Sequence, residues 1–410
     1  MTDIFLNSEH GVTIAKRRTS EQLLQDSGPY ASLLRDLMQA AKSRGASDVH
    51  IEPHEQGVDL RLRIDGNLML EKTVDVGHRE SLILETKRIF GLSIGISGRP
   101  QDGRSSFPSL RLDVRVSLLP THFGEKIVMR LLNLDASFAL EQLGFLKDEQ
   151  EVLERATRFD NGVVIVSGPT GSGKTRTLYS LLNKIDPRRH NIVTLEDPIE
   201  YRIDGLNQVQ VSEKMTFASA LRAVLRQDPD VILVGEIRDS ETAKLCFQAA
   251  ETGHLVFSTL HANGALEVID RLRGLGVDDF ALQSNLRLSI AQRLEQTICR
   301  ECSVAVPEDY ILNTYREELK EYPLDRRINA FQKSEECWKC PHCNDGVSGR
   351  APILEYASYT DPEETGEKKE LFLYRSLEES RMVRMFQGDV ACEDSGYDPN
   401  ENSGEVTYVE

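Results

Sequence analysis

Residues 168 to 175 read GPTGSGKT, a glycine-rich loop between an apolar run at 163–166 and a helical pattern that begins near Leu178. Such a loop turns its backbone N–H groups inward around phosphate oxygens, and the start of the following helix adds its positive dipole end. Lys174 would reach the β- and γ-phosphates of a nucleotide, and the Thr175 hydroxyl would bind Mg²⁺. The predicted phosphate-binding residues are Gly168, Pro169, Thr170, Gly171, Ser172, Gly173, Lys174 and Thr175.

Acidic side chains follow two further apolar runs. Glu196 and Asp197 come directly after the run that ends at Leu195, and Glu236 comes two residues after Val234. Phosphoryl transfer to water needs bound Mg²⁺ and a group that orients the attacking water. We expect Glu236 to orient the water, and Glu196 and Asp197 to hold the water shell of the metal. Each of these acids, taken alone, could equally be a solvated loop residue.

Two histidines flank a third apolar run. His254 precedes residues 255–259 and His261 follows them. Residues seven positions apart point to opposite faces of a continuous strand, so one of the two histidines is expected beyond its end. His261 is the better candidate for sensing the γ-phosphate, and His254 is then a hydrogen-bonded structural histidine.

The cysteines have the spacing of a metal site. Cys299 and Cys302 form one C-x₂-C pair, and Cys340 and Cys343 form a second. Four thiolates can close a tetrahedral shell around Zn²⁺, so a structural, non-catalytic zinc site is predicted. Cys337 and Cys340 have the same spacing, so chemistry alone leaves the second pair open. Reduced cysteines without a metal are the alternative.

The elements that must position these residues fall into several parts. Strands and helices alternate from the loop onward, which predicts an α/β fold: a P-loop NTPase (RecA-like) domain whose parallel sheet binds ligands at the carboxyl ends of its strands. Before it, an Asp65-Gly66 turn between alternating runs predicts a hairpin within a smaller α+β domain. The expected parts are a flexible N-terminal segment at 1–28, an α+β domain at 29–135, a P-loop core at 136–295, a tetracysteine zinc lobe at 296–356, a helical region at 357–386 and an acidic, disordered tail at 387–410.

Composition argues against several function classes. The 410 residues carry a formal net charge of −17, which does not favour a nucleic-acid binder because phosphate neutralisation needs clustered Lys and Arg. Residues 387–410 contain seven acidic residues and no Lys or Arg. No apolar run approaches the eighteen residues of a membrane span, and the first ten residues lack the pattern of a secretory signal. We therefore expect a cytoplasmic protein with reduced or metal-bound cysteines.

Several long motifs occur in the order found in one family. GPTGSGKT, TLEDPIEY, LRQDPDVILVGEIRD and TGHLVFSTLHAN resemble the Walker A, Asp box, Walker B and His box of the secretion and pilus-assembly ATPases of the GspE/PilB type. The similarity continues upstream in SDVHIEP, RLRIDG, RPQDGR and LPTHFGEKIVMRLL, and downstream to the cysteine pairs. It covers residues 29 to about 356.

This resemblance implies particular residue roles. Glu236 matches the Walker B acid and Glu196 the Asp-box acid. Arg104 and Arg115 match arginines that the preceding domain of the family brings toward the nucleotide, where a guanidinium stabilises charge on the transferring phosphoryl group. The glycine run in NDGVSGR after Cys343 selects Cys340 and Cys343 as the second zinc pair.

The resemblance also implies the function and the partners. We expect a homo-hexamer that hydrolyses ATP with Mg²⁺ and drives type IV pilus assembly or type II secretion through an inner-membrane platform protein, with membrane association only through that partner. Only 28 residues precede Pro29, which does not favour docking through the extra N-terminal domain of many relatives. The alternatives are a retraction-type pilus motor, a nucleotide-gated platform without turnover and a conjugation-type DNA-transfer ATPase.

Overall fold

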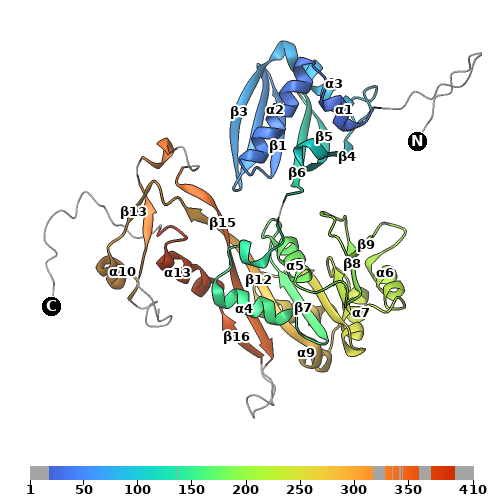
Figure 1. The fold of residues 1–410 in the computed structure, drawn as a ribbon, viewed down its shortest axis with the longest axis vertical. Helices are drawn as coiled ribbons and strands as arrows, with labels where there is room; N and C mark the ends of the chain where they lie inside the picture. Colours follow the sequence, from blue (N-terminus) through green and yellow to red (C-terminus); the bar gives the residue numbers. More distant parts are fainter. Residues whose placement is uncertain are drawn as a thin grey trace, which may run out of the picture. The chain divides into compact units, whose positions relative to one another are not determined.

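The structure is a computed structural model. It describes residues 18–135, 137–316, 328–334, 336–340, 343, 345–359 and 371–392. The first part of the N-terminal segment and the acidic tail from residue 393 lie outside the described residues. The chain divides into two compact units, Met1–Ala136 and Ser137–Glu410, each built on its own sheet (Figure 1).

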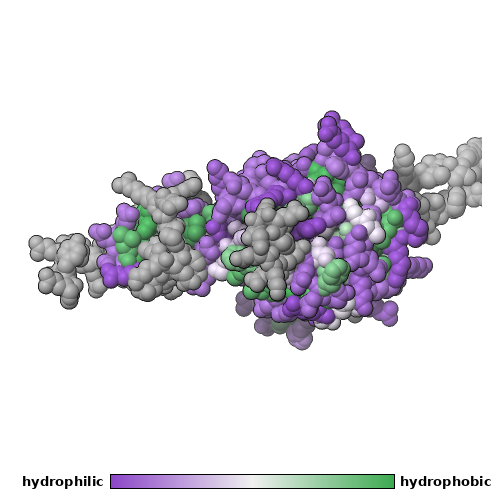
Figure 2. Space-filling view, turned by 90° about the horizontal axis from the view of Figure 1, so that it is seen from below, coloured by the Kyte–Doolittle hydropathy of each residue, from purple (hydrophilic) through white to green (hydrophobic). Residues whose placement is uncertain are grey.

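One face of the described structure is largely polar (Figure 2). Figure 2 shows a face on which most of the visible side chains are hydrophilic and the apolar ones form small groups. Among the residues that the structure describes, no helix combines the length and the apolar character needed to cross a membrane.

The first unit contains a six-stranded antiparallel sheet in the order β3-β2-β1-β6-β5-β4. Three helices cover one face of it, and their apolar side chains form one core with those of alternate strand residues (Figure 1). The strands are β1 (Asp48–His54), β2 (Gly57–Ile64), β3 (Asn67–Asp75), β4 (Gln101–Phe107), β5 (Leu112–Thr121) and β6 (Gly124–Asn133), and the helices are α1 (Ser20–Leu24), α2 (Pro29–Ser43) and α3 (Arg79–Phe90). The predicted hairpin is confirmed, because Asp65 and Gly66 join β2 to β3 with positive φ angles of 48° and 90°.

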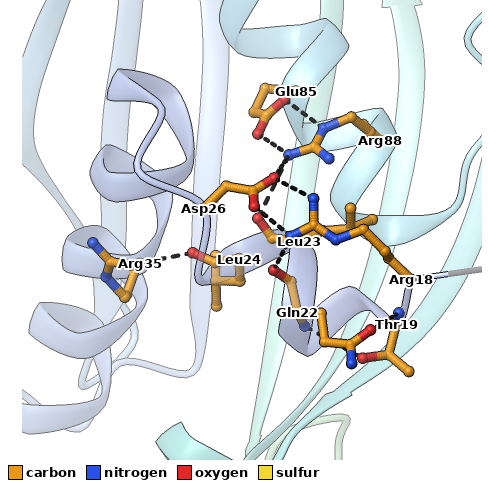
Figure 3. Close-up of polar contacts among 9 residues, drawn as sticks. All are labelled: Arg18, Thr19, Gln22, Leu23, Leu24, Asp26, Arg35, Glu85 and Arg88. Carbon is orange, nitrogen blue, oxygen red and sulfur yellow. Dashed lines mark hydrogen bonds and ion pairs between the residues drawn. The ribbon is translucent and has the colours of Figure 1, made fainter.

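An ion-pair network attaches α1 to this unit (Figure 3). The carboxylate of Asp26 accepts hydrogen bonds from Arg18 and from Arg88, and Arg88 is also paired with Glu85 at 2.6 Å. The hydrogen bonds from Arg18 and Arg88 lower the pKa of Asp26. Leu24 is fully buried in the core. Residues 18–28 therefore pack as part of this unit, although they fall within the segment that was expected to be flexible.

The second unit is built on an eight-stranded sheet in the order β16-β15-β12-β7-β11-β10-β8-β9. The six strands from β12 to β9 are parallel, whereas β15 and β16 are antiparallel to their neighbours. The strands are β7 (Gly162–Ser167), β8 (Ile192–Glu196), β9 (Asn207–Gln210), β10 (Val231–Val234), β11 (Leu255–Leu260), β12 (Leu286–Ile298), β15 (Val347–Tyr359) and β16 (Leu371–Arg375). A separate pair, β13 (Ser303–Ala305) and β14 (Phe331–Lys333), lies near the cysteines.

Helices cover both faces of the parallel part of the sheet, which confirms the predicted α/β class. In β7, Val163 and Ile165 enter one core and Val164 and Val166 enter the other, so all four are fully buried. On one face lie α4 (Lys147–Ala156) and α5 (Lys174–Asn183), and on the other α6 (Phe217–Val224), α7 (Ser240–Glu251), α8 (Ala265–Gly274) and α9 (Asp279–Asn285).

The cysteine region is continuous with the sheet. Strand β12 is thirteen residues long and runs directly into Cys299, so the expected boundary between residues 295 and 296 falls inside a strand. The partner strand β15 returns from the cysteines to the sheet. Two further helices belong to this region, α10 (Glu308–Thr314) and α13 (Leu377–Gln387), and α13 contacts both β12 and β15.

Candidate active site

The phosphate-binding loop connects the carboxyl end of β7 to the start of α5. Its glycines are required by close packing against β12. A Cβ atom on Gly168 would lie 2.4 Å from the backbone oxygen of Gln292, and one on Gly173 would lie 2.8 Å from the Gln292 Nε2. Both glycines also have positive φ angles, of 145° and 88°. The loop is therefore a preformed cradle of the kind that fits phosphates.

Lys174 is the first residue of α5, and its side chain turns back over the loop. The Nζ atom donates to the backbone oxygens of Gly168 at 2.8 Å and of Pro169 at 3.0 Å. Burial lowers the pKa of Lys174, Glu236 opposes this shift, and Arg293 adds to it. Thr175 follows as a half-buried residue in the first turn of α5.

Glu236 lies just beyond the carboxyl end of β10, beside a guanidinium and an imidazole. Its Oε2 accepts a hydrogen bond from Arg238 Nε at 2.8 Å, and its Oε1 lies 3.3 Å from His261 Nε2. The Glu236 side chain is 19% exposed. Gly235, the residue before Glu236, packs closely against β8: a Cβ atom at this position would lie 3.0 Å from the backbone oxygen of Leu195.

Glu196 ends β8 and is held by donors from three elements. Its Oε1 accepts from Thr194 Oγ1 at 2.5 Å and from Gln208 Nε2 at 3.1 Å, and its Oε2 accepts from the hydroxyl of Tyr179 on α5. Burial and the neighbouring carboxylate raise the pKa of Tyr179, so this hydroxyl remains a donor. Glu196 is therefore a fixed carboxylate, whereas Asp197 is exposed to solvent.

The strand order brings the predicted residues to one edge of the sheet. The loop follows β7, His261 follows the adjacent β11, Glu236 follows β10 and Glu196 ends β8. Parallel pairing places these carboxyl ends side by side. This edge can hold a polyphosphate at the loop with two carboxylates and an imidazole beyond it.

His254 lies at the opposite edge, before the first residue of β11. Its Nδ1 is 2.8 Å from the backbone oxygen of Ala249 and 3.1 Å from Thr252 Oγ1. The residue lines a polar cavity of about 660 Å³ at the amino ends of β10 and β11, away from the phosphate-binding loop. His254 thus has the geometry of a hydrogen-bonded structural histidine.

Arg104 and Arg115 belong to the first unit. They are register partners on β4 and β5, and Arg104 Nη2 lies 2.9 Å from Asp113 Oδ2. The structure brings the two arginines together on neighbouring strands of their own unit.

Four cysteine thiols converge at the end of β12. The Sγ atoms of Cys299, Cys302, Cys340 and Cys343 all lie within 4.8 Å of one another, and those of Cys302 and Cys343 are 3.6 Å apart. Zinc–sulfur bonds of about 2.3 Å in a tetrahedron put sulfurs roughly 3.8 Å apart, so the four thiols fit Zn²⁺. Cys337 instead donates to Asp345 Oδ1 at 3.2 Å, which excludes it from this set.

Sequence reasoning missed several residues that contact the predicted site. Gln292 and Arg293 lie on β12, more than one hundred residues after the loop, and Gln208 lies on β9. No local pattern marks them, because their role depends on which strands are neighbours in the sheet. Tyr179 could have been noticed one helical turn after Thr175, as a polar ring in an apolar stripe.

Comparisons with known proteins agree with this architecture. The family model described as "Type II/IV secretion system protein" matches residues 23–388. The type IV pilus assembly ATPase PilB of Acinetobacter baylyi is 41% identical over 345 residues, covering 82% of this chain and 58% of that protein. The type II secretion system ATPase E of Vibrio cholerae is 39% identical over 364 residues, covering 87% of this chain and 71% of that protein.

A solved structure has the same fold. The ATPase DotB of Legionella pneumophila superposes with a TM-score of 0.63 at 20% identity, covering 90% of this chain and 96% of that one. The chain spans little more than half the length of the PilB relative. The resemblance inferred from the motifs is confirmed, and the chain belongs to the type II/IV secretion system protein family.

Proposed function

We propose that this protein hydrolyses ATP to ADP and phosphate and that the reaction powers type IV pilus assembly or type II secretion. The observation that carries the proposal is the arrangement at one edge of the sheet: Lys174 over a glycine cradle, with Glu236 near enough to influence its pKa. The two relatives that are 41% and 39% identical to this chain are named as ATPases of those two systems.

The glycine cradle is the feature that fits a nucleotide phosphate. A Cβ atom at Gly168 or Gly173 would collide with Gln292, so the loop keeps this shape with glycine at both positions. The buried Ser172 Oγ beside Gly168 has no hydrogen-bond partner among the described residues. Backbone N–H groups and Lys174 would bind the phosphates of ATP there, and Thr175 would hold Mg²⁺. Mg²⁺, when bound, supplies charge neutralisation for the phosphates.

The two carboxylates take different roles. Glu236, fixed by Arg238, would orient the attacking water and accept its proton. Glu196, fixed by three donors, would contribute a negative charge toward the water shell of the metal, with the exposed Asp197 beside it. His261, 3.3 Å from Glu236, would sense the γ-phosphate.

Arg104 and Arg115 would complete the site in the assembled protein. A planar guanidinium suits stabilisation of charge on a transferring phosphoryl group, and its arrival from another unit would couple movement to hydrolysis. We propose that this happens in a homo-hexamer, since a site that borrows arginines in this way works in a closed ring. The ring would lie in the cytoplasm, peripheral to the inner membrane, bound to a platform protein and not to nucleic acid.

The tetracysteine set would hold a structural Zn²⁺. Burial and the neighbouring thiols raise the pKa of Cys302, so this thiol favours the protonated form and zinc binding would release its proton. The metal would join β12 to the segment before β15, at a distance from the phosphate-binding loop.

The test is steady-state ATP hydrolysis of the wild type, Glu236→Gln and the matched control Glu241→Gln, over a range of protein concentrations. Glu241 is exposed at the start of α7 and is paired with Arg222. We expect the turnover rate of wild type to rise as the protein assembles. In Glu236→Gln the turnover rate should fall about a hundredfold to a thousandfold, although the variant still binds ADP. Full activity of Glu236→Gln would contradict the role assigned to Glu236. A wild type that binds ATP but does not hydrolyse it would contradict the proposed ATPase activity.

A further inference from the structure

Gln292 connects the phosphate-binding loop to the neighbouring strand. It lies in the middle of β12, which pairs with β7 at the point where the loop begins, and it is 2% exposed. Its Nε2 donates to the backbone oxygen of Ser172 at 2.7 Å, and its Oε1 accepts from Thr177 Oγ1 at 2.8 Å. Both ends of this buried amide are therefore engaged, one by the loop and one by α5.

The hydrogen bond to Ser172 controls the direction of one peptide unit. The oxygen of Ser172 and the N–H of Gly173 belong to the same peptide, and in a trans peptide these two groups point in opposite directions. Because Gln292 holds the oxygen toward β12, the N–H of Gly173 points away from β12. That is the direction required of an N–H that binds phosphate in the cradle.

The orientation of the Gln292 amide is itself fixed. A backbone oxygen can only accept, so the NH₂ group must face Ser172. The hydroxyl of Thr177 donates to the other end, and Thr177 is 1% exposed. A rotation of the amide by 180° would place its oxygen against the oxygen of Ser172 and its NH₂ toward the hydroxyl that now donates to it.

We propose that Gln292 is a positioning residue for nucleotide phosphates, acting through the Ser172–Gly173 peptide. This inference rests on the proposed function, because it assigns a role in the same ATP site. Without the amide, the peptide can rotate, and the Gly173 N–H is no longer held toward the phosphate. The contact is present in both the bound substrate and the transition state, so its loss weakens binding more than it slows chemistry.

The test compares Gln292→Met with Gln296→Met in the full-length protein. Methionine keeps the approximate volume but has no strong donor, and Gln296 lies four residues further along the same strand. For Gln292→Met we expect the KM for ATP and the Kd for MgADP to rise about tenfold to a hundredfold, with kcat within about threefold of wild type. For Gln296→Met all three quantities, KM, Kd and kcat, stay at wild-type values.

The pattern of kinetic changes separates positioning from damage to the fold. A partly unfolded preparation lowers kcat in proportion to the lost sites and leaves KM unchanged. An unchanged KM and an unchanged MgADP affinity in Gln292→Met would therefore overturn the inference. If Gln292→Met does not fold, Thr177→Val removes the donor that fixes the amide and should raise KM in the same direction by a smaller factor, and no rise would overturn the inference as well.

The wild-type measurement distinguishes this inference from the proposed function. If wild type neither hydrolyses ATP nor binds MgADP, the proposed function fails and the positioning role fails with it. If wild type binds and turns over ATP but Gln292→Met matches it, only the role of Gln292 is wrong.

Discussion

Glu149 offers the most direct test of how the C-terminal helix is held. This glutamate lies on α4 and is fully buried. Its carboxylate accepts hydrogen bonds from the Leu146 N–H at 2.9 Å, from Arg384 Nη2 at 3.2 Å and from the Ser380 hydroxyl. Arg384 and Ser380 both belong to α13, more than two hundred residues away in the sequence. We therefore expect Glu149 to be the main polar attachment of α13 to α4.

The magnitude follows from the burial of both charges. Removing one partner of a buried ion pair costs about 3–5 kcal/mol, because the other charge stays buried without compensation. Burial raises the pKa of Glu149 and lowers that of Arg384, and glutamine keeps an acceptor oxygen, so the low end of this range applies to Glu149→Gln. At about 2–4 °C per kcal/mol for a domain of some 200 residues, about 3 kcal/mol lowers Tm by roughly 6–12 °C.

The assay is thermal unfolding of the full-length protein, with hydrogen exchange of the α13 amides as a local readout. Glu151→Gln is the matched control, since this residue lies on the same helix but is exposed to solvent. It should change Tm by about 1–2 °C at most. Equal values of Tm and equal α13 protection in the two variants would refute the reasoning. A combined Glu149→Met and Arg384→Met variant should recover much of the loss, because no charge is then buried alone.

Two further outcomes are expected. Cys302→Ser should abolish the binding of about one Zn²⁺ per chain and lower Tm, whereas Cys337→Ser should keep the metal. Elemental analysis measures the zinc content of both variants, and equal zinc content would contradict the assigned ligands. Burial lowers the pKa of His50 below its usual 6.5, so the unfolded chain takes up a proton that the folded chain does not, and stability should fall as pH drops through 6.5. The loss in free energy of unfolding is at most about 1.4 kcal/mol per pH unit for one proton and should disappear in His50→Gln. If urea unfolding gives the same change in free energy between pH 7.5 and 5.5 for wild type and His50→Gln, this contribution of His50 is excluded.

Much of the architecture is encoded in local sequence. The loop from Gly168 to Thr175 is recognisable because glycine spacing, the apolar run before it and the helix after it are all neighbours in the chain. The Asp65-Gly66 hairpin is predictable for the same reason, since its positive φ angles favour those residue types. Acidic residues that follow apolar runs could be assigned to one edge because parallel strands align their carboxyl ends.

Other features depend on which segments become neighbours. Cys337 and Cys343 are equivalent partners for Cys340 by spacing, but the backbone directs the Cys337 thiol to Asp345 and the Cys343 thiol to Cys302.

The sequence alone therefore determined the α/β class, the phosphate-binding loop and the strand ends that carry the acids, because each depends on residues close together in the chain. Tertiary structure decided the supports of that site: Gln292 against Ser172, Tyr179 against Glu196, and Arg384 against Glu149. These contacts follow from strand order and helix packing, which bring together residues that are far apart in the chain. The local sequence around each residue does not identify the residue that it contacts.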